Sequence, residues 1–348
     1  MRIVVKVGTG VVSLEDGRLA LGRIGSLVEQ IVALMGRGHQ VVLVSSGAVG
    51  LGAARLGIGR VDVVDRQAAA AVGQLSLLGL YDELVRRHGG TVAQVLLTET
   101  DFHHRAHYLN LAAALERLLE LGALPIVNEN DVVSTVELAL HGQVFGDNDR
   151  LAALLASSLG ADLLLLLSDV DGVYTAPPSE PGAERIRTFD ATAEVSIGAG
   201  SAFGRGGMAS KIGAARVAAQ SGVQAVIASG CIPGTLLQVV DGADVGTTFL
   251  AEPGMNRRRQ WIAFATVPSG TLEVNDGARR AVVERNASLL APGLVRVDGT
   301  FESGAVVRLT CDGVEFARGI LRCSSTELAS RERGVVVHRD DIAILGET

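Results

Sequence analysis

The chain opens with "MRIVVKVGTGVV" (1–12), and this stretch indicates the fold class. Residues 3–5 and 7 are apolar without alternation, which is typical of a strand covered on both faces of a sheet. Lys6 interrupts the apolar run immediately before the Gly-Thr-Gly of residues 8–10. A simple interpretation is an edge strand whose lysine points to water.

Lysine is rare in this chain. Of the 31 lysine and arginine residues, only Lys6 and Lys211 are lysine. The other residues of this set are arginine. We therefore base the functional prediction on the residues that surround the two lysines.

Composition excludes several classes of protein. The 348 residues suffice for two domains, and with 48% hydrophobic and 20% charged residues the chain is typical of globular proteins. A net charge of −7 argues against a general nucleic-acid coat, so any phosphate site must be made locally. Three scattered cysteines do not make a disulfide framework or a zinc site. With no signal-peptide pattern and no apolar run of membrane-spanning length, we expect a cytoplasmic protein that is not bound to membranes.

Strand and helix patterns alternate up to about residue 250. Apolar strands are predicted at 2–7, 40–45, 91–98, 124–128, 162–168 and 223–229. Amphipathic helices are predicted at 21–37 and 105–121, ending at Gly38 and Gly122. This alternation predicts an α/β fold with a parallel or mixed sheet between helices, which binds ligands beyond the carboxyl ends of its strands.

The pattern changes around residues 250–264, where proline, glycine and three consecutive arginines occur. Short strands with frequent glycine follow, and one helix is predicted at about 276–284, capped by Asn275 or Asp276. We therefore expect a first domain at 1–252, a linker at 253–262 and a small β-rich domain at 263–348.

Two glycine-rich stretches follow predicted strands in the first half of the chain. In "KVGTG" (6–10), glycine lets the backbone approach a ligand and exposes N–H groups to phosphate oxygens. In "VSSGAVGLG" (44–52), Ser46, Gly47 and Ala48 fall at a helix N-terminus, which favours anions. An ordinary turn capped by serine is the alternative for the second stretch.

Two further stretches add amides, acids and the second lysine. The amide and acid side chains of "VNENDVV" (127–133) and "FGDNDRLAALLA" (145–156) include Asn128, Asn130, Asp131, Asp147, Asn148 and Asp149. "GRGGMASKIGAA" (204–215) places glycines before a helix whose first turns contain Lys211. Two lysines, backbone amides and positioning acids together indicate phosphoryl transfer, and a carboxylate acceptor would need no general base.

Six motifs, "VVKVGT", "VSSGAVG", "VNEND", "GDND", "LLLLSDVDGVYT" and "GGMASK", resemble those of the glutamate 5-kinases in the amino acid kinase family. The resemblance covers residues 1 to about 250, and about 260–346 resemble a PUA domain. It implies a three-layer αβα sandwich with a mainly parallel sheet. It also implies ATP-dependent phosphorylation of the side-chain carboxylate of L-glutamate, the first step of proline biosynthesis. Mg²⁺, feedback inhibition by proline and a homo-oligomer are further implications.

Site residues follow from the resemblance by position. Lys6, Lys211 and Asp149 would be catalytic, with Asp149 organising both lysines. The glutamate site would be formed by Ser46, Asp131 and Asn148, with Thr9, Gly47 and Ala48 near the reacting groups. The ATP site would be formed by Lys6, Ser168, Asp169, Arg205, Gly206, Gly207, Met208, Ala209, Ser210 and Lys211. Ser168 replaces a common threonine and keeps its hydroxyl, whereas Arg205 replaces a threonine with a long cation.

Two alternatives stay open at this point. One is another amino acid kinase, acting on aspartate, acetylglutamate or a nucleoside monophosphate. The other is an RNA-binding protein that acts through the PUA domain. Charge argues against the second, because residues 255–348 carry 13 arginines and 12 acids, far from the basic surface of an RNA binder.

Overall fold

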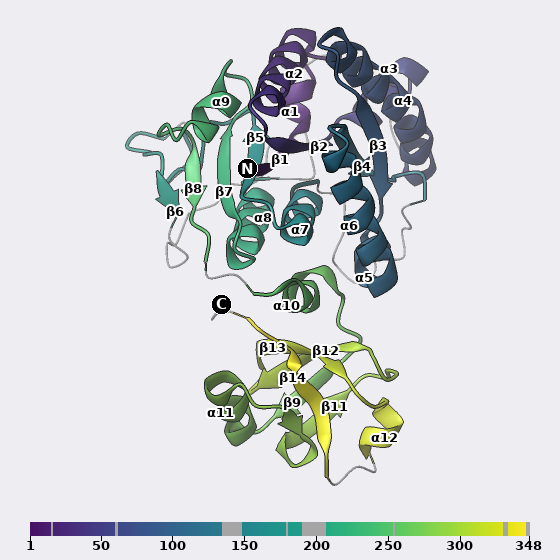
Figure 1. Cartoon of the computed structure of the whole chain (residues 1–348), viewed down its shortest axis with the longest axis vertical. Helices are drawn as coiled ribbons and strands as arrows, with labels where there is room; N and C mark the ends of the chain where they lie inside the picture. Colours follow the sequence, from purple (N-terminus) through teal and green to yellow (C-terminus); the bar gives the residue numbers. More distant parts are fainter. Residues whose placement is uncertain are drawn as a thin grey trace. The chain divides into compact units, whose positions relative to one another are not determined.

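The computed structural model describes residues 1–14, 17–59, 62–133, 148–178, 180–189, 207–252, 255–329 and 333–345. The chain divides into two compact units, Met1–Asp101 with Ala106–Pro253, and Phe102–Arg105 with Gly254–Thr348. Figure 1 shows a sheet in each unit. Among the described helices, none has the length and apolar character that crossing a membrane requires.

The described part of the first unit forms an eight-stranded sheet with the order β3-β4-β2-β1-β5-β7-β8-β6. Its strands are β1 (Arg2–Val7), β2 (Gln40–Ser45), β3 (Val92–Leu97), β4 (Leu124–Glu129), β5 (Leu163–Ser168), β6 (Thr188–Phe189), β7 (Gln224–Ser229) and β8 (Thr247–Phe249). All neighbouring pairs are parallel except β7 and β8. The predicted mainly parallel sheet is confirmed.

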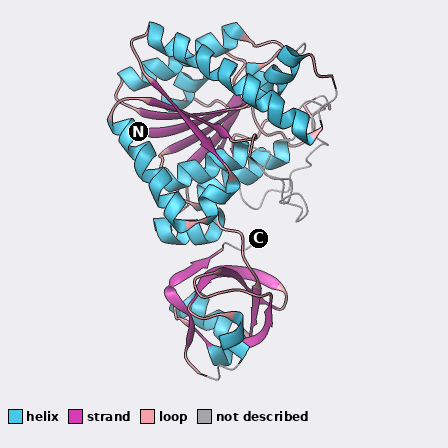
Figure 2. Cartoon of the chain, turned by 90° about the vertical axis from the view of Figure 1, so that its right-hand side faces the viewer, coloured by secondary structure: helices cyan, strands magenta, loops and turns pink. Residues whose placement is uncertain are grey.

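Helices cover both faces of this sheet (Figures 1 and 2). They are α1 (Thr9–Val12), α2 (Leu21–Gly36), α3 (Ala48–Leu56), α4 (Val63–Arg87), α5 (Glu99–His103), α6 (Arg105–Glu120), α7 (Asn148–Leu159), α8 (Met208–Gln220) and α9 (Thr235–Val240). On one face α2 contacts both α4 and α9, while α7 packs against α8 and β1 on the other. This is the three-layer sandwich that the resemblance predicted.

Strand β1 lies inside the sheet, between β2 and β5, so the edge-strand interpretation of Lys6 is wrong. Val5 and Val7 belong to the core that includes the buried side of α2. Side chains alternate along a strand, so Lys6 lies on the opposite face, toward α7. Only 4% of Lys6 is exposed.

The backbones of helices α3 and α4 approach each other unusually closely because glycines lie at their contact. A Cβ on Gly73 would lie 1.8 Å from the carbonyl oxygen of Ala48, and one on Gly52 would lie 1.7 Å from that of Ala69. No larger residue fits at either position. The contact places the middle of α4 beside the first residue of α3.

The predicted helix ends in the first unit are confirmed. Helices α2 and α6 are followed by Gly38 at φ +84° and Gly122 at φ +72°, a left-handed conformation that glycine adopts readily.

The second unit contains a six-stranded sheet in its described residues, with the order β10-β14-β13-β12-β9-β11. The strands are β9 (Thr271–Val274), β10 (Leu289–Leu290), β11 (Leu294–Asp298), β12 (Val306–Cys311), β13 (Val314–Leu321) and β14 (Val335–Ile344). Its helices are α10 (Arg257–Gln260), a π-helix (Trp261–Ala265), α11 (Asp276–Arg285), a 3₁₀ helix (Ala291–Gly293) and α12 (Ser325–Ala329).

Two predictions concern helices of this unit. Asn275 caps α11 by accepting a hydrogen bond from the backbone N–H of Ala278 at 2.8 Å, as one of the two predicted caps. The residues predicted as a linker, 253–262, include α10, so part of that stretch is helical. The sheet surrounds its own apolar core, which includes Leu272, Leu309 and Val337.

Candidate active site

The sheet order brings the predicted site segments together. Strands β4, β2, β1 and β5 are neighbours and parallel, so their carboxyl ends lie along one edge of the sheet. The amide-rich segment spans the end of β4 and the residues after it, Ser46 follows β2, the Gly-Thr-Gly segment leads from β1 into α1, and Asp169 follows β5. After β1 the chain continues to β2 on one side of it, and later returns to β5 on its other side. Open α/β sheets bind ligands at such a reversal of strand order.

Lys6, Asp149 and Lys211 form a buried cluster at this edge. The Nζ atom of Lys6 lies 2.5 Å from Oδ1 of Asp149, and the Nζ atom of Lys211 lies 3.2 Å from Oδ2 of the same carboxylate. Lys211 is 7% exposed and Asp149 is fully buried. The sequence predicted that these three side chains meet, and the structure brings them together.

The charge balance of this cluster favours an anion. Asp149 lies in the first turn of α7, and Lys211 lies in the first turns of α8, so two helix N-termini point toward the cluster. The described residues place two ammonium groups and one carboxylate here, in a protein whose net charge is −7. Lysine ammonium groups and helix N-termini both bind phosphoryl oxygens.

The loop after β1 lies beside the end of β5. The backbone N–H of Gly8 donates to the carbonyl oxygen of Leu167 at 3.0 Å. A Cβ on Gly10 would lie 3.2 Å from Cγ of Asp169, so the loop fits closely against that side chain. Thr9 and Asp169 are exposed, and the buried Ser168 hydroxyl donates to Oδ1 of Asp169 at 2.9 Å.

A network of amides joins the ends of β2 and β4 to the start of α7. Nδ2 of Asn148 donates to the Ser46 hydroxyl oxygen at 3.0 Å, to the Ser45 carbonyl oxygen at 3.2 Å and to Oδ1 of Asn128 at 2.8 Å. Gly47, at φ +103°, precedes α3, whose first residue is the buried Ala48. The structure therefore brings the predicted residues Ser46, Gly47, Ala48 and Asn148 into one neighbourhood.

A cavity of about 180 Å³ opens beside this network. Its wall includes Ala48, Gln74, Gln94, Asn130 and Asp131, with apolar side chains of α4 and β3. The volume is well below the roughly 300–1,000 Å³ of pockets that hold drug-sized ligands. A small molecule would fill it, and Asp131 lies in its wall.

The N-terminus of α8 forms the remaining side of the predicted nucleotide site. Gly207 precedes this helix in an extended conformation, and Met208, Ala209 and Ser210 form its first turn with partly exposed side chains. Arg205, Gly206 and Asp147 lie outside the described residues.

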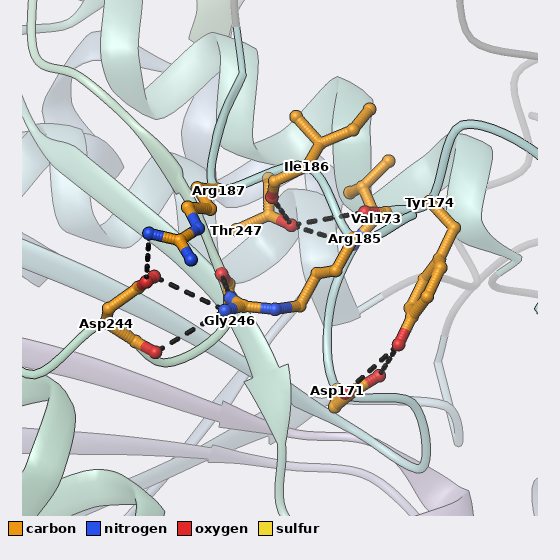
Figure 3. A network of polar contacts seen from close by, with 9 residues as sticks. All are labelled: Asp171, Val173, Tyr174, Arg185, Ile186, Arg187, Asp244, Gly246 and Thr247. Atoms are coloured by element: carbon orange, nitrogen blue, oxygen red, sulfur yellow. Dashed lines mark hydrogen bonds and ion pairs between the residues drawn. The ribbon is translucent and has the colours of Figure 1, made fainter. Parts of the chain in front are cut away.

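Beyond Asp169, a second polar network holds the chain that follows β5 (Figure 3). Thr247 of β8 accepts a hydrogen bond from the backbone N–H of Val173 at 2.8 Å and donates to the carbonyl oxygen of Ile186 at 2.6 Å. Arg185 donates to the carbonyl oxygen of Gly246 and pairs with Asp244. The Tyr174 hydroxyl donates to Asp171 at 2.9 Å, which raises the pKa of the phenol.

Sequence reasoning missed two polar residues of this site, and both come from α4. Oε1 of Gln74 accepts a hydrogen bond from Nδ2 of Asn128 at 2.8 Å. The Tyr81 hydroxyl lies 2.9 Å from Oγ of Ser45. The two residues are seven apart, two helical turns, and with Leu77 they lie on the buried face of α4. Polar side chains on an otherwise apolar helix face were the available signal.

Burial determines the state of Tyr81. Desolvation raises the pKa of its phenol to about 12, although the hydrogen bond with Ser45 acts in the opposite direction. The phenol is therefore neutral at physiological pH.

The amino acid kinase family model matches residues 1–229, and the PUA domain model matches residues 270–342. The chain belongs to the amino acid kinase family. It is a phosphotransferase of this family with a C-terminal PUA domain.

Similar curated proteins are glutamate 5-kinases. The protein of Trichlorobacter lovleyi is 42% identical over 99% of this chain and 96% of its own length. That of Myxococcus xanthus is 43% identical over the same shares of the two chains. Among solved structures, isopentenyl phosphate kinase has a TM-score of 0.51 at 18% identity and covers 72% of this chain and 100% of its own, a likeness of fold.

Proposed function

We propose that this protein transfers the γ-phosphoryl group of ATP to the side-chain carboxylate of L-glutamate, the first step of proline biosynthesis. The observation that carries this proposal is the buried Lys6–Asp149–Lys211 cluster between the amide network and the end of β5. The similarity to glutamate 5-kinases over nearly their whole length supports glutamate as the acceptor.

The cluster would act on the transferring group by charge. In phosphoryl transfer, negative charge spreads over the phosphoryl oxygens, and catalysis is mostly positioning and electrostatic stabilisation. Lys6 would contact the phosphoryl group and Lys211 the nucleotide phosphates, while Asp149 holds the two Nζ atoms at fixed separation. The acceptor is already a carboxylate, so no group has to remove a proton from it.

The acceptor and nucleotide would approach from opposite sides of β1. Glutamate would occupy the β2–β4 side, with Ser46, Asn148 and Asp131 as binding groups and Thr9, Gly47 and Ala48 near the reacting atoms. ATP would occupy the β5 side, with Ser168, Asp169 and residues 205–211 around it.

The residues on the nucleotide side fit a magnesium ion that is held chiefly by the nucleotide itself. Asp169 presents one exposed carboxylate there, and the described residues contain no group of three or more metal-ligating side chains. Mg²⁺ is bound in such sites by one or two carboxylates together with substrate phosphates. Asp169 would be its protein ligand, and the ion would neutralise phosphate charge.

An acceptor panel tests this function. We expect ATP turnover to require L-glutamate and the product to be trapped by hydroxylamine as the glutamyl hydroxamate. Aspartate, N-acetylglutamate and nucleoside monophosphates should not replace glutamate. Turnover that does not depend on glutamate in this panel would reject the assignment.

Further elements of the proposal follow the resemblance. Residues 1–252 would be the catalytic domain and 263–348 the PUA domain, joined by 253–262, in a cytoplasmic homo-oligomer that proline inhibits. Adding proline to the glutamate assay, with sedimentation of the same samples, tests inhibition and assembly together.

A further inference from the structure

We propose that Gln74 is a positioning residue, because its side-chain carbonyl helps to hold a hydrogen-bond relay in the direction that leaves the Ser46 hydroxyl as a donor toward the acceptor substrate. The relay runs from Gln74 through Asn128 and Asn148 to Ser46. This inference rests on the proposed function of the site and adds the means by which it selects its substrate.

Backbone groups determine which way the two asparagine amides face. Oδ1 of Asn128 accepts a hydrogen bond from the backbone N–H of Glu129 at 2.9 Å. A backbone N–H can only donate, so the other end of this amide, Nδ2, must face Gln74. In the same way, the Ser45 carbonyl oxygen can only accept, so Nδ2 of Asn148 faces it.

The direction at Gln74 then follows. Nδ2 of Asn128 donates, so the group of Gln74 that lies 2.8 Å away must be its oxygen, Oε1. Gln74 is 8% exposed and Asn128 is 3% exposed, so water does not readily replace either partner. The backbone approach of α3 and α4 at Gly73 holds the neighbouring Gln74 at this position.

The direction at the substrate end follows as well. Nδ2 of Asn148 directs its two hydrogens at three acceptors, one of which is the hydroxyl oxygen of Ser46. Among the described residues, no acceptor faces the Ser46 hydroxyl proton, and no donor faces Oδ1 of Asn148. The site therefore offers one donor, suited to a carboxylate, and one acceptor, suited to an ammonium group. An amino acid carries both groups.

Without the acceptor on Gln74, the amide of Asn128 loses the group that its Nδ2 faces. Only the hydrogen bond from the Glu129 N–H then opposes rotation of this amide, and a rotated amide presents Nδ2 to Asn148, which reverses the relay. Two amide nitrogens would face each other, and Asn148 would no longer hold Ser46 as a donor.

The experiment compares Gln74→Met with Gln238→Met, because Gln238 is an exposed glutamine of α9 that lies neither in the relay nor in the cavity wall. KM and kcat for L-glutamate and for ATP are measured by the hydroxamate assay. For Gln74→Met we expect kcat/KM for glutamate to fall by about tenfold to a hundredfold, chiefly through KM, with KM for ATP unchanged. Gln238→Met should behave like wild type.

A double-mutant cycle separates positioning from general damage. If Gln74 acts through Ser46, Gln74→Met should cost little in a Ser46→Ala background, because the donor it positions is already gone. Losses that multiply would show that Gln74 acts elsewhere and would overturn the inference.

Two controls keep the outcomes distinct. If Gln74→Met does not fold, Gln74→Glu replaces it in the experiment. This variant keeps an acceptor oxygen, so it should raise KM for glutamate by less than about tenfold. A larger rise in KM contradicts the relay. If wild type shows no glutamate-dependent turnover, the proposed function fails. If wild type is active and Gln74→Met matches Gln238→Met, only the relay fails.

Discussion

Asp149 bridges the two lysines of the site, each by a different carboxylate oxygen. Replacing it with asparagine would remove the carboxylate that both buried ammonium groups contact. Removing one partner of a buried ion pair destabilises a protein by about 3–5 kcal/mol.

For Asp149→Asn we therefore expect a lower free energy of unfolding by this order and a loss of turnover by orders of magnitude. Lys6→Ala and Lys211→Ala should lose turnover to a similar extent, because each removes positive charge from the transferring group. Urea unfolding and single-turnover kinetics measure the two effects. Turnover of Asp149→Asn within tenfold of wild type contradicts the role of the bridge.

Because Tyr81 is buried, we expect the protein to lose stability at alkaline pH. Burial raises the pKa of its phenol to about 12, above the value near 10 in the unfolded chain. Below pH 10 the phenol is neutral in both states, and its contribution to stability is fully present. As pH rises from 10 toward 12, the unfolded chain loses the proton first, so stability falls.

Comparison with Tyr81→Phe isolates this effect, since all other titrating groups are shared. At neutral pH the variant should be less stable by about 1 kcal/mol, because it lacks the hydrogen bond to Ser45. Between pH 10 and 11 wild type should lose about 1 kcal/mol more than the variant. A difference that stays constant with pH would mean that the buried phenol does not titrate above the unfolded one.

At the scale of elements, the contact of α3 with α4 sets the position of the acceptor side. For Gly73→Ala we expect lower stability and a higher KM for glutamate, because the new Cβ meets the Ala48 carbonyl oxygen at 1.8 Å and the helices must separate. Gly79→Ala is the matched control on the same helix, where a Cβ meets nothing within 4 Å. It should stabilise the protein by up to about 1 kcal/mol.

Thermal unfolding and steady-state kinetics of both variants test this pair. Equal behaviour of the two alanine variants would show that α3 and α4 tolerate separation at this contact.

Strand β8 has a corresponding role on the nucleotide side. Thr247→Val removes the hydrogen bonds of that hydroxyl and leaves the Val173 N–H without its buried acceptor (Figure 3). We expect a cost of about 1–3 kcal/mol in stability and a raised KM for ATP, with KM for glutamate unchanged. Thr248→Val, at the next residue of the same strand, serves as the control. A raised KM for glutamate instead of ATP would contradict the placement of this network on the nucleotide side.

For the whole molecule, charge distribution argues against a general role in RNA binding. Residues 1–254 carry a net charge of −8, and residues 255–348 carry +1. Binding to RNA releases counterions in proportion to the phosphates neutralised, so it requires a basic surface. We expect no submicromolar complex with structured RNA in a fluorescence-anisotropy titration at 50 mM salt. A tight complex that weakens steeply with salt would contradict this.

Much of the architecture could be predicted from sequence, because local patterns carry it. Continuous apolar runs predicted the buried strands, and Gly38 and Gly122 predicted two helix ends, since left-handed backbone favours glycine. The scarcity of lysine pointed to Lys6 and Lys211 before any contact was known.

Which residues touch depended on the order of strands, which no local pattern encodes. Only the placement of β1 between β2 and β5 turns Lys6 from a charge on an apolar strand into a partner of Asp149. The roles of Gln74 and Tyr81 could not be predicted for the same reason. A polar residue on a helix face indicates no function until its hydrogen-bond partner is known. Sequence determined the elements and the chemical groups through local propensity, whereas tertiary structure decided their pairing, since buried polar groups are oriented by partners distant in the chain.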